Sequence, residues 1–232
     1  MRPPLSQADY VARVQAVLAP LADAGKAQAM RAYMREQFDF LGVQTPARRA
    51  GLAALGRARF DAAGALQAAE QLWRLPGREY RYAAVDLLAQ HARVLQPGHV
   101  PRLLRLAQRE AWWDTVDGLA GVVGDVLRAA RTAQPDVQQL MDEALLHKSL
   151  WVRRIAMIHQ LGWRLQTDTG RLYGYALALA HEEDFFIRKA IGWALRDYAR
   201  WNPQGVRDFT AQHRHQLSTL SVREATRHLG ET

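Results

Sequence analysis

Apolar residues recur three and four positions apart along almost the whole chain, which is the spacing of an amphipathic helix. Two examples are the sets Val14, Val17, Leu18 and Leu21, and Met30, Tyr33, Met34 and Phe38. The chain has no sustained two-residue alternation, the pattern of a half-buried strand. The sequence therefore predicts an all-α protein with about a dozen helices, mostly of about 10–16 residues and joined by short connections.

Proline and capping residues predict where several helices begin. Thr45-Pro46, Gln134-Pro135 and Asn202-Pro203 each place a proline in a first helical turn, where its missing N–H is not needed. Ser221 and Glu224 have the spacing of a capping box, in which each side chain bonds the backbone of the other residue. We therefore expect one more helix to begin at Ser221.

A weak repeat runs through these helices. Arg81, Arg153 and Arg188 are each followed three residues later by Ala or Ile. They are separated by 72 and 35 residues, and 72 is about twice 36. The period is therefore about 36 residues, the size of a helical hairpin, with one repeat between Arg81 and Arg153 that lacks this arginine. The position 36 residues after Arg81 is Asp117. This spacing predicts a solenoid whose concave face carries a row of arginines that Asp117 interrupts.

Composition narrows the class of protein. A chain of 232 residues with 49% hydrophobic residues can bury one or two cores and is not intrinsically disordered. The absence of cysteine excludes disulfide scaffolds, zinc–thiolate and iron–sulfur sites and thiol nucleophiles. No apolar run approaches the roughly 18 residues of a membrane helix, and residues 1–24 lack a signal-peptide core. We expect a cytoplasmic protein without a membrane anchor.

The charge balance points to a polyanionic partner. The chain has 31 Lys and Arg against 23 Asp and Glu, a formal charge of +8, and its only lysines are Lys26, Lys148 and Lys189. A GC-rich genome can explain the excess of arginine over lysine, but it does not explain the sign of the charge. Because arginine binds phosphates in a fork geometry, nucleic acid is a favoured partner, beside anionic membranes and acidic proteins.

Three tryptophan groupings stand out as candidate chemistry. In one of them, Trp151, Arg153 and Arg154 share one helical turn. Trp113 and Asp117 are four residues apart, so they share one face of a helix, and Asp114 between them is expected to cap that helix. Lys189, Trp193 and Arg196 follow at intervals of four and three and form one stripe. Such a stripe is most often an amphipathic helix with a snorkelling base, but its recurrence near one repeat period favours a functional surface.

Seven motifs follow one another in order within about residues 26–228. They are Tyr33-Met34-Arg35, Phe38–Arg49, Leu72-Trp73, Arg78-Glu79-Tyr80, Trp112–Asp117, Phe185–Arg196 and Leu220–Ala225. Together they resemble the AlkD-type DNA alkylation-repair glycosylases. The resemblance implies a right-handed α-solenoid of HEAT-like repeats in a single domain, 1–232, with N-terminal helices over 5–40 and repeats over about 45–228. It also implies a monomer that binds alkylated double-stranded DNA and needs no cofactor or metal.

The same resemblance assigns roles to individual residues. Trp113 and Asp117 match the catalytic pair, and Trp193 matches a second aromatic wall. Arg154 matches a contact to DNA beside the lesion, and its distance along the chain to Trp193 favours it over Arg153. The remaining DNA-contacting positions are Tyr33, Gln44, Thr45, Arg49 and Arg196.

The implied reaction fits the chemistry of these side chains. Alkylation at N3 or N7 makes a purine cationic, which weakens its glycosidic bond and attracts it to tryptophan faces. Asp117 can stabilise the positive charge that develops on the sugar, and the activated base needs no general acid. Two other classes stay open: a non-catalytic HEAT-repeat module that binds damaged or branched DNA, and a protein-binding scaffold.

Overall fold

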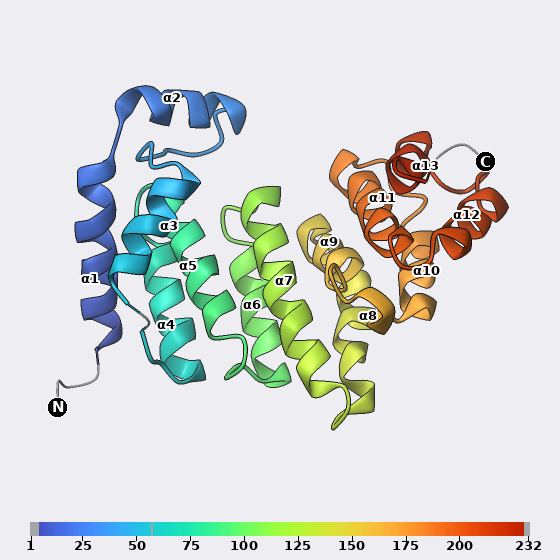
Figure 1. Ribbon diagram of the computed structural model, residues 1–232, viewed down its shortest axis with the longest axis horizontal. Coiled ribbons are helices and arrows are strands. Elements are labelled where there is room, and N and C mark those ends of the chain that lie inside the picture. Colours follow the sequence, from blue (N-terminus) through green and yellow to red (C-terminus); the bar gives the residue numbers. More distant parts are fainter. Residues whose placement is uncertain (1–4, 57, 230–232) are drawn as a thin grey trace. The chain divides into compact units, whose positions relative to one another are not determined.

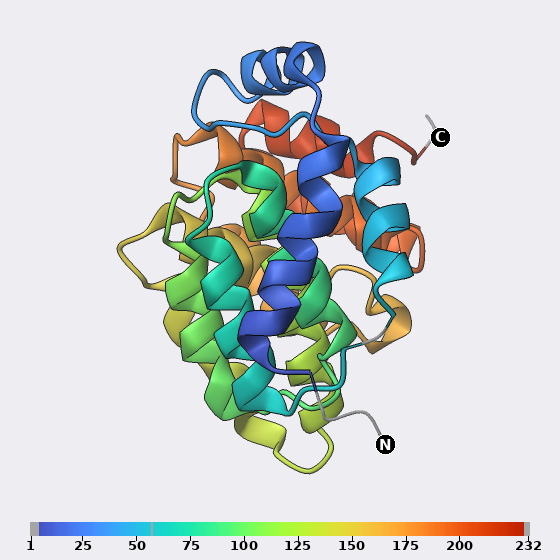
Figure 2. The same cartoon turned by 90° about the vertical axis from the view of Figure 1, so that its left-hand side faces the viewer.

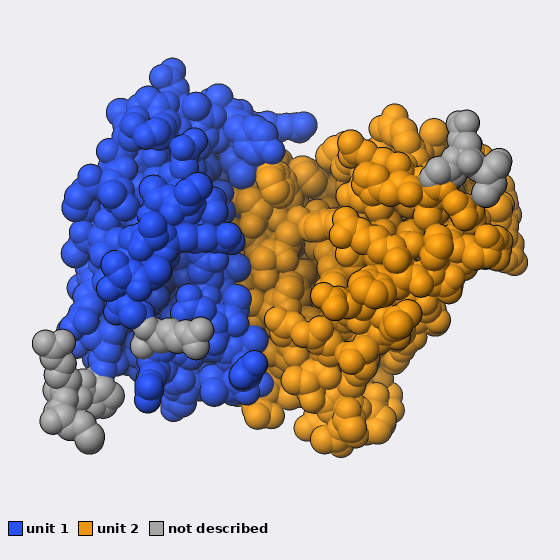
Figure 3. Space-filling model, in the orientation of Figure 1, with its two compact units in different colours: residues 1–95 blue, residues 96–232 orange. Residues whose placement is uncertain are grey.

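The computed structural model describes residues 5–56 and 58–229, and within these ranges all regular structure is helical. Thirteen α-helices and four short 3-10 helices follow one another along this part of the chain (Figure 1). The prediction of an all-α fold is confirmed. Backbone contacts group the helices into two compact units, residues 1–95 and 96–232 (Figure 3). That the whole chain forms one domain stays a prediction.

Unit 1 holds the first five α-helices. In it, α1 packs against α3, α4 and α5, and α4 packs against α5 (Figure 2). Buried apolar side chains such as Val14, Leu66 and Leu87 fill the space between them. The bounds are α1 Gln7–Leu18, α2 Ala24–Tyr33, α3 Thr45–Ala54, α4 Ala62–Trp73 and α5 Arg78–Gln90, with the 3-10 helix η1 at Ala19–Leu21.

Unit 2 is built of helix pairs in which α7, α9, α11 and α13 pack against one another in chain order. The helices α6, α8 and α12 each pack against the next of these four. The bounds are α6 Val100–Ala107, α7 Trp113–Ala130, α8 Gln139–Leu145, α9 Leu150–Ile158, α10 Thr169–Ala178, α11 Phe185–Ala199, α12 Pro203–Gln212 and α13 Thr219–Thr226. The 3-10 helices of this unit are η2 Pro97–His99, η3 Pro135–Gln138 and η4 Arg164–Gln166.

The helix starts follow a regular period. The helices α5, α7, α9, α11 and α13 begin 35, 37, 35 and 34 residues apart. This spacing agrees with the predicted period of about 36 residues. The fourth residue of α5, α9 and α11 is in each case the repeat arginine, and the fourth residue of α7 is Val116. The expectation that Asp117 fills the missing repeat position is therefore wrong by one residue, because the helix starts are unevenly spaced.

The repeat arginines have a structural role inside each repeat. The guanidinium groups of Arg81, Arg153 and Arg188 each donate to the backbone carbonyl of the residue six positions earlier, in the loop before the helix. These carbonyls belong to the connections between helices, which need a hydrogen-bond donor when they are not exposed to water. The three arginines therefore join each loop to its helix. Arg81 is buried and does not belong to an exposed row, whereas Arg153 and Arg188 are half-buried and their place in such a row stays a prediction.

Most of the predicted helix starts agree with the structure. Thr45 is the first residue of α3, Pro135 begins η3, and the Asn202 side chain caps α12 by accepting the N–H of Gly205. The capping box at Ser221 is wrong, because α13 begins earlier: the Ser218 side chain accepts the N–H of Ser221. The carboxylate of Glu224 is thereby available for partners on another helix.

Candidate active site and nucleic-acid interface

Arg154 ties three helices of unit 2 together around Asp117. Its Nε and Nη2 atoms donate to the two carboxylate oxygens of Asp117 at 2.7 and 2.8 Å. Its Nη1 donates to the backbone carbonyl of Phe186. Since Asp117 lies on α7, Arg154 on α9 and Phe186 on α11, a single guanidinium fixes the carboxylate relative to both neighbouring helices.

This ion pair lies mostly out of water. The side chain of Arg154 is 5% exposed and that of Asp117 is 16% exposed. Burial raises the pKa of Asp117 above its ordinary value, the hydrogen bonds and charge of Arg154 oppose that rise, and the charge of Asp114 adds to it. The site therefore holds a poorly solvated carboxyl group whose charge is balanced by the guanidinium that binds both of its oxygens.

The start of α7 differs from the expectation. Trp112 occupies the N-cap position without a side-chain cap, and α7 begins at Trp113. Asp114 is the second residue of the helix and not its cap, so that prediction is wrong. An acidic residue in a first turn still stabilises the helix, because the N-terminal end carries a partial positive charge. Trp113 and Asp117 do lie on one helix, one turn apart, as predicted.

An aromatic cluster joins the starts of the same three helices. The rings of Trp112, Trp151 and Phe186 lie with centroids 5.0–5.7 Å apart, at tilted or edge-on angles. Phe185 adds an edge contact to Phe186 and is itself exposed. Sequence reasoning placed Trp151 with its arginines but gave Phe186 no role. The signal for it was present, since Trp151 and Phe186 hold the second position of α9 and α11.

The remaining predicted site residues of unit 2 lie on α11. Trp193 is half-buried, two turns after Phe186, and Arg196 follows one turn later. Lys189 and Arg196 both bind the carboxylate of Glu224 on α13, at 2.8 and 2.6 Å. The two bases therefore share a helix face, as the predicted stripe requires. Lys189 and Arg196 together hold the pKa of Glu224 below its ordinary value.

Arg153 and Arg154, which sequence reasoning compared as candidates, have different partners. Arg153 forms a two-bond pair with Glu182, with Nε–Oε1 at 2.6 Å and Nη2–Oε2 at 2.7 Å. Arg154 alone reaches Asp117. The structure thus brings Arg154 to the predicted catalytic carboxylate, while its contact with DNA stays a prediction.

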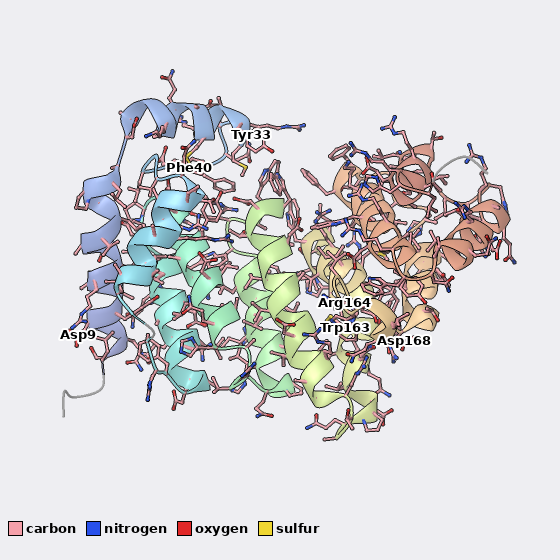
Figure 4. The ribbon with its side chains drawn as sticks, in the orientation of Figure 1. Asp9, Tyr33, Phe40, Trp163, Arg164 and Asp168 are labelled. Atoms are coloured by element: carbon pink, nitrogen blue, oxygen red, sulfur yellow. The ribbon has the colours of Figure 1, made fainter. Side chains whose placement is uncertain are left out.

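The predicted DNA-contacting residues of unit 1 lie on its surface. Tyr33 is the last residue of α2 and is 72% exposed (Figure 4). Gln44 and Thr45 stand at the start of α3, Arg49 follows on the same helix, and all three are exposed. The neighbouring Arg48 is buried and pairs with Asp86 on α5 at 3.3 Å. Of two adjacent arginines, only Arg49 presents its charge to solvent.

Two buried charged residues fix the segment between α2 and α3. The carboxylate of Glu79 accepts the backbone N–H groups of Leu41, Gly42 and Val43 at 2.8–2.9 Å. The guanidinium of Arg78 lies 3.7 Å from the ring centroid of Phe38. A carboxylate with three such donors is firmly held, so the segment that ends at the start of α3 has a defined course.

Comparison with known proteins decides the family. Residues 14–229 match the family described as DNA alkylation repair enzyme. The chain belongs to that family. A role in the repair of alkylated DNA follows for this DNA alkylation repair family member. A comparison with curated proteins gave no match.

Two solved structures resemble this family member. A predicted DNA alkylation repair enzyme from Enterococcus faecalis is 30% identical, with a TM-score of 0.83, over 91% of this chain and 98% of that one. AlkD2 from Streptococcus mutans is 17% identical, with a TM-score of 0.60, over 96% of each chain. The second likeness shows the fold alone. Over the described residues, the repair family member has no helix long and apolar enough to cross a membrane.

Proposed function

We propose that this protein is a DNA glycosylase that releases cationic N3- and N7-alkylated purines, such as 3-methyladenine and 7-methylguanine, from double-stranded DNA. The observation that carries the proposal is the mostly buried carboxylate of Asp117, which accepts two hydrogen bonds from Arg154. As the sequence predicts, we propose that it acts as a cytoplasmic monomer without cofactor or metal.

The proposed reaction is hydrolysis at C1′ of the damaged nucleotide. The bond from C1′ to N9 breaks, and its electron pair neutralises the positive charge of the alkylated base. Asp117 stabilises the positive charge on the sugar and orients a water, whose oxygen bonds to C1′ while its proton passes to Asp117 or to solvent. The products are the free base and an abasic site in DNA.

The aromatic side chains supply the remaining attraction. Trp113 lies one helical turn before Asp117, and Trp193 lies on α11, which Arg154 links to Asp117. A tryptophan face attracts a cationic base or sugar by about 0.5–2 kcal/mol. Tyr33, Gln44, Thr45, Arg49, Arg154 and Arg196 are the proposed contacts to DNA.

The test is release of 7-methylguanine and 3-methyladenine from alkylated duplex DNA by the wild type and by Asp117→Asn. We expect the wild type to release both bases and the variant to lose most of this activity while keeping its affinity for DNA. Uracil, a neutral base, serves as the control lesion and should be released poorly. Full activity of Asp117→Asn, or efficient uracil release, would contradict the proposed mechanism.

One observation favours a second candidate function. Both oxygens of Asp117 are bound by Arg154, as in a purely structural ion pair. A non-catalytic module that binds damaged or branched DNA would use the same exposed residues without Asp117 chemistry. Tight binding of alkylated DNA with no base release by the wild type would select this function.

A further inference from the structure

The last helix, α13, packs closely against the helix that carries Trp193. A Cβ atom added at Gly192 would lie 2.5 Å from Cβ of Glu224 and 2.9 Å from the carbonyl oxygen of Ser221, so only glycine permits this approach. The Ser221 hydroxyl also donates to the backbone carbonyl of Arg188 at 2.9 Å. The side chain of Glu224 is therefore presented to α11 from a fixed backbone.

Glu224 binds two cations that flank Trp193. Its Oε1 pairs with Nζ of Lys189 at 2.8 Å and its Oε2 pairs with Nη1 of Arg196 at 2.6 Å. Lys189 precedes Trp193 by four residues and Arg196 follows it by three, so all three side chains share one face of α11. One carboxylate thus sets the direction of both bases on either side of the tryptophan.

The cluster of Lys189, Arg196 and Glu224 has a net positive charge and is partly exposed to solvent. Two cations share one carboxylate, and the side chains of Lys189 and Arg196 are 36% and 20% exposed, against 11% for Glu224. The acid is therefore covered while the bases reach solvent. A phosphodiester is the anion that matches such a site on a DNA-repair protein, because ammonium and guanidinium groups both donate to its oxygens.

We propose that Glu224 is a positioning residue, which holds Lys189 and Arg196 beside Trp193 as a preset site for a phosphodiester of the damaged nucleotide. This inference rests on the proposed glycosylase function. Lysine and arginine side chains are flexible when unpaired, so a shared carboxylate orders them before DNA arrives. Order of this kind affects the rate at which correctly placed DNA reacts more than it affects total attraction.

Positioning and simple charge predict similar binding of DNA by Glu224→Gln but different rates of base release. By charge alone, removal of an acid makes the protein more basic and tightens its binding to DNA. If Glu224 positions the two bases, the variant binds unmodified DNA at least as tightly, with a steeper salt dependence, yet releases base more slowly at saturating DNA. We expect a loss in kcat of about ten- to hundredfold.

The matched control is Glu143→Gln, which makes the same charge change at an exposed residue of α8 in the same unit. It should leave kcat unchanged. Glu224→Asp keeps the charge and the fold and should show an intermediate rate, so it tests the proposal even if Glu224→Gln is unstable. Thermal unfolding of each variant checks that the protein compared is folded.

A double-substitution cycle with Arg196→Gln separates positioning from a structural role. If Glu224 acts through Arg196, the loss in kcat on adding Glu224→Gln is much smaller in the Arg196→Gln background. Equal losses in both backgrounds, or a Glu224→Gln rate within twofold of wild type, would overturn the inference. If the wild type releases no base, the proposed function fails, whereas the salt dependence of Glu224→Gln still shows whether Glu224 restrains the two cations.

Discussion

The proton affinity of Asp117 depends on one partner. Burial raises the pKa of this carboxyl, and only the two hydrogen bonds and the charge of Arg154 oppose that rise. In the proposed reaction the carboxylate is the form of Asp117 that stabilises a cationic sugar. Arg154 then has two proposed roles: it keeps Asp117 ionised and it fixes the direction of the carboxylate.

Replacement of Arg154 by Gln should therefore shift the pH profile of base release. The pKa of Asp117 rises further when Arg154 is lost, so a larger part of the protein carries a neutral Asp117 at mildly acidic pH. We expect a loss of rate that is greater near about pH 6 than near about pH 8, measured after subtraction of spontaneous depurination. Arg153→Gln is the control, since Arg153 binds Glu182 instead. A loss that is equal at both pH values would contradict this role.

His159 makes the stability of unit 2 depend on pH. The side chain is buried, its Nδ1 donates to the carbonyl of Ala156 at 2.7 Å, and its Nε2 has no hydrogen-bond partner among the described residues. Burial lowers the pKa of His159 to about 4; the nearby charge of Arg171 acts in the same direction, while Asp142 and Asp168 oppose it. The described structure therefore contains the neutral imidazole.

The sign of the effect follows from the two pKa values. Between pH 6.5 and about 4 the unfolded chain binds a proton that folded His159 does not, so stability is complete above 6.5 and falls as the pH drops towards 4. The loss approaches about 3 kcal/mol. Urea unfolding as a function of pH should show this decline in stability in the wild type. The control His181→Gln replaces an exposed histidine and should show the same decline, whereas His159→Phe should show a smaller one. An unchanged decline in His159→Phe would exclude His159 as its source.

At the scale of helices, close approach between repeats depends on small residues. A Cβ at Gly124 of α7 would lie 2.0 Å from the backbone carbonyl oxygen of His159, so α7 cannot keep its distance to that backbone with any other residue. Gly121, three residues earlier on the same helix, has no atom within 4 Å of the same position. The two glycines therefore have different functions despite their common sequence setting.

Gly124→Ala should destabilise the protein, whereas Gly121→Ala should not. The added methyl at residue 124 forces α7 away from the end of α9, at an expected cost of about 1–3 kcal/mol or more. The methyl at residue 121 meets open space and improves helix propensity, a gain of about 1 kcal/mol at most. Chemical denaturation of both variants measures the difference. Equal stabilities would show that the backbones of α7 and α9 adjust freely.

The positions of the helices could be predicted from the sequence better than the ion pairs that join one helix to another. Period, proline positions and the stripe on α11 depend on local spacing, and the structure agrees with them. The error at Asp117 arises because the spacing of helix starts varies by a residue or two, which periodicity alone cannot detect. The ion pairs of Asp117 with Arg154 and of Glu224 with Arg196 join residues 28–37 positions apart, so they depend on how repeats stack.

For the whole molecule, the contribution of each arginine to DNA binding depends on the partner that its guanidinium already has within the protein. Arg48 is buried in an ion pair with Asp86, so its charge adds little to a DNA-binding surface. Arg49 is exposed at the start of α3. The formal charge of +8 therefore does not show which residues attract DNA. We expect exposed arginines at the predicted DNA contacts to contribute more to the binding of DNA than other arginines do.

The salt dependence of DNA binding tests which arginines contact phosphates. Each phosphate neutralised by a basic side chain releases a counterion, so the slope of log K against log salt grows by about 0.9 per contact. Arg49→Gln should reduce that slope by about one for unmodified duplex DNA. Arg13→Gln removes an equal charge from an exposed position on α1 that no motif links to DNA, and it should leave the slope nearly unchanged. If the two variants gave the same slope, attraction would depend on net charge alone, and Arg49 would not be a phosphate contact.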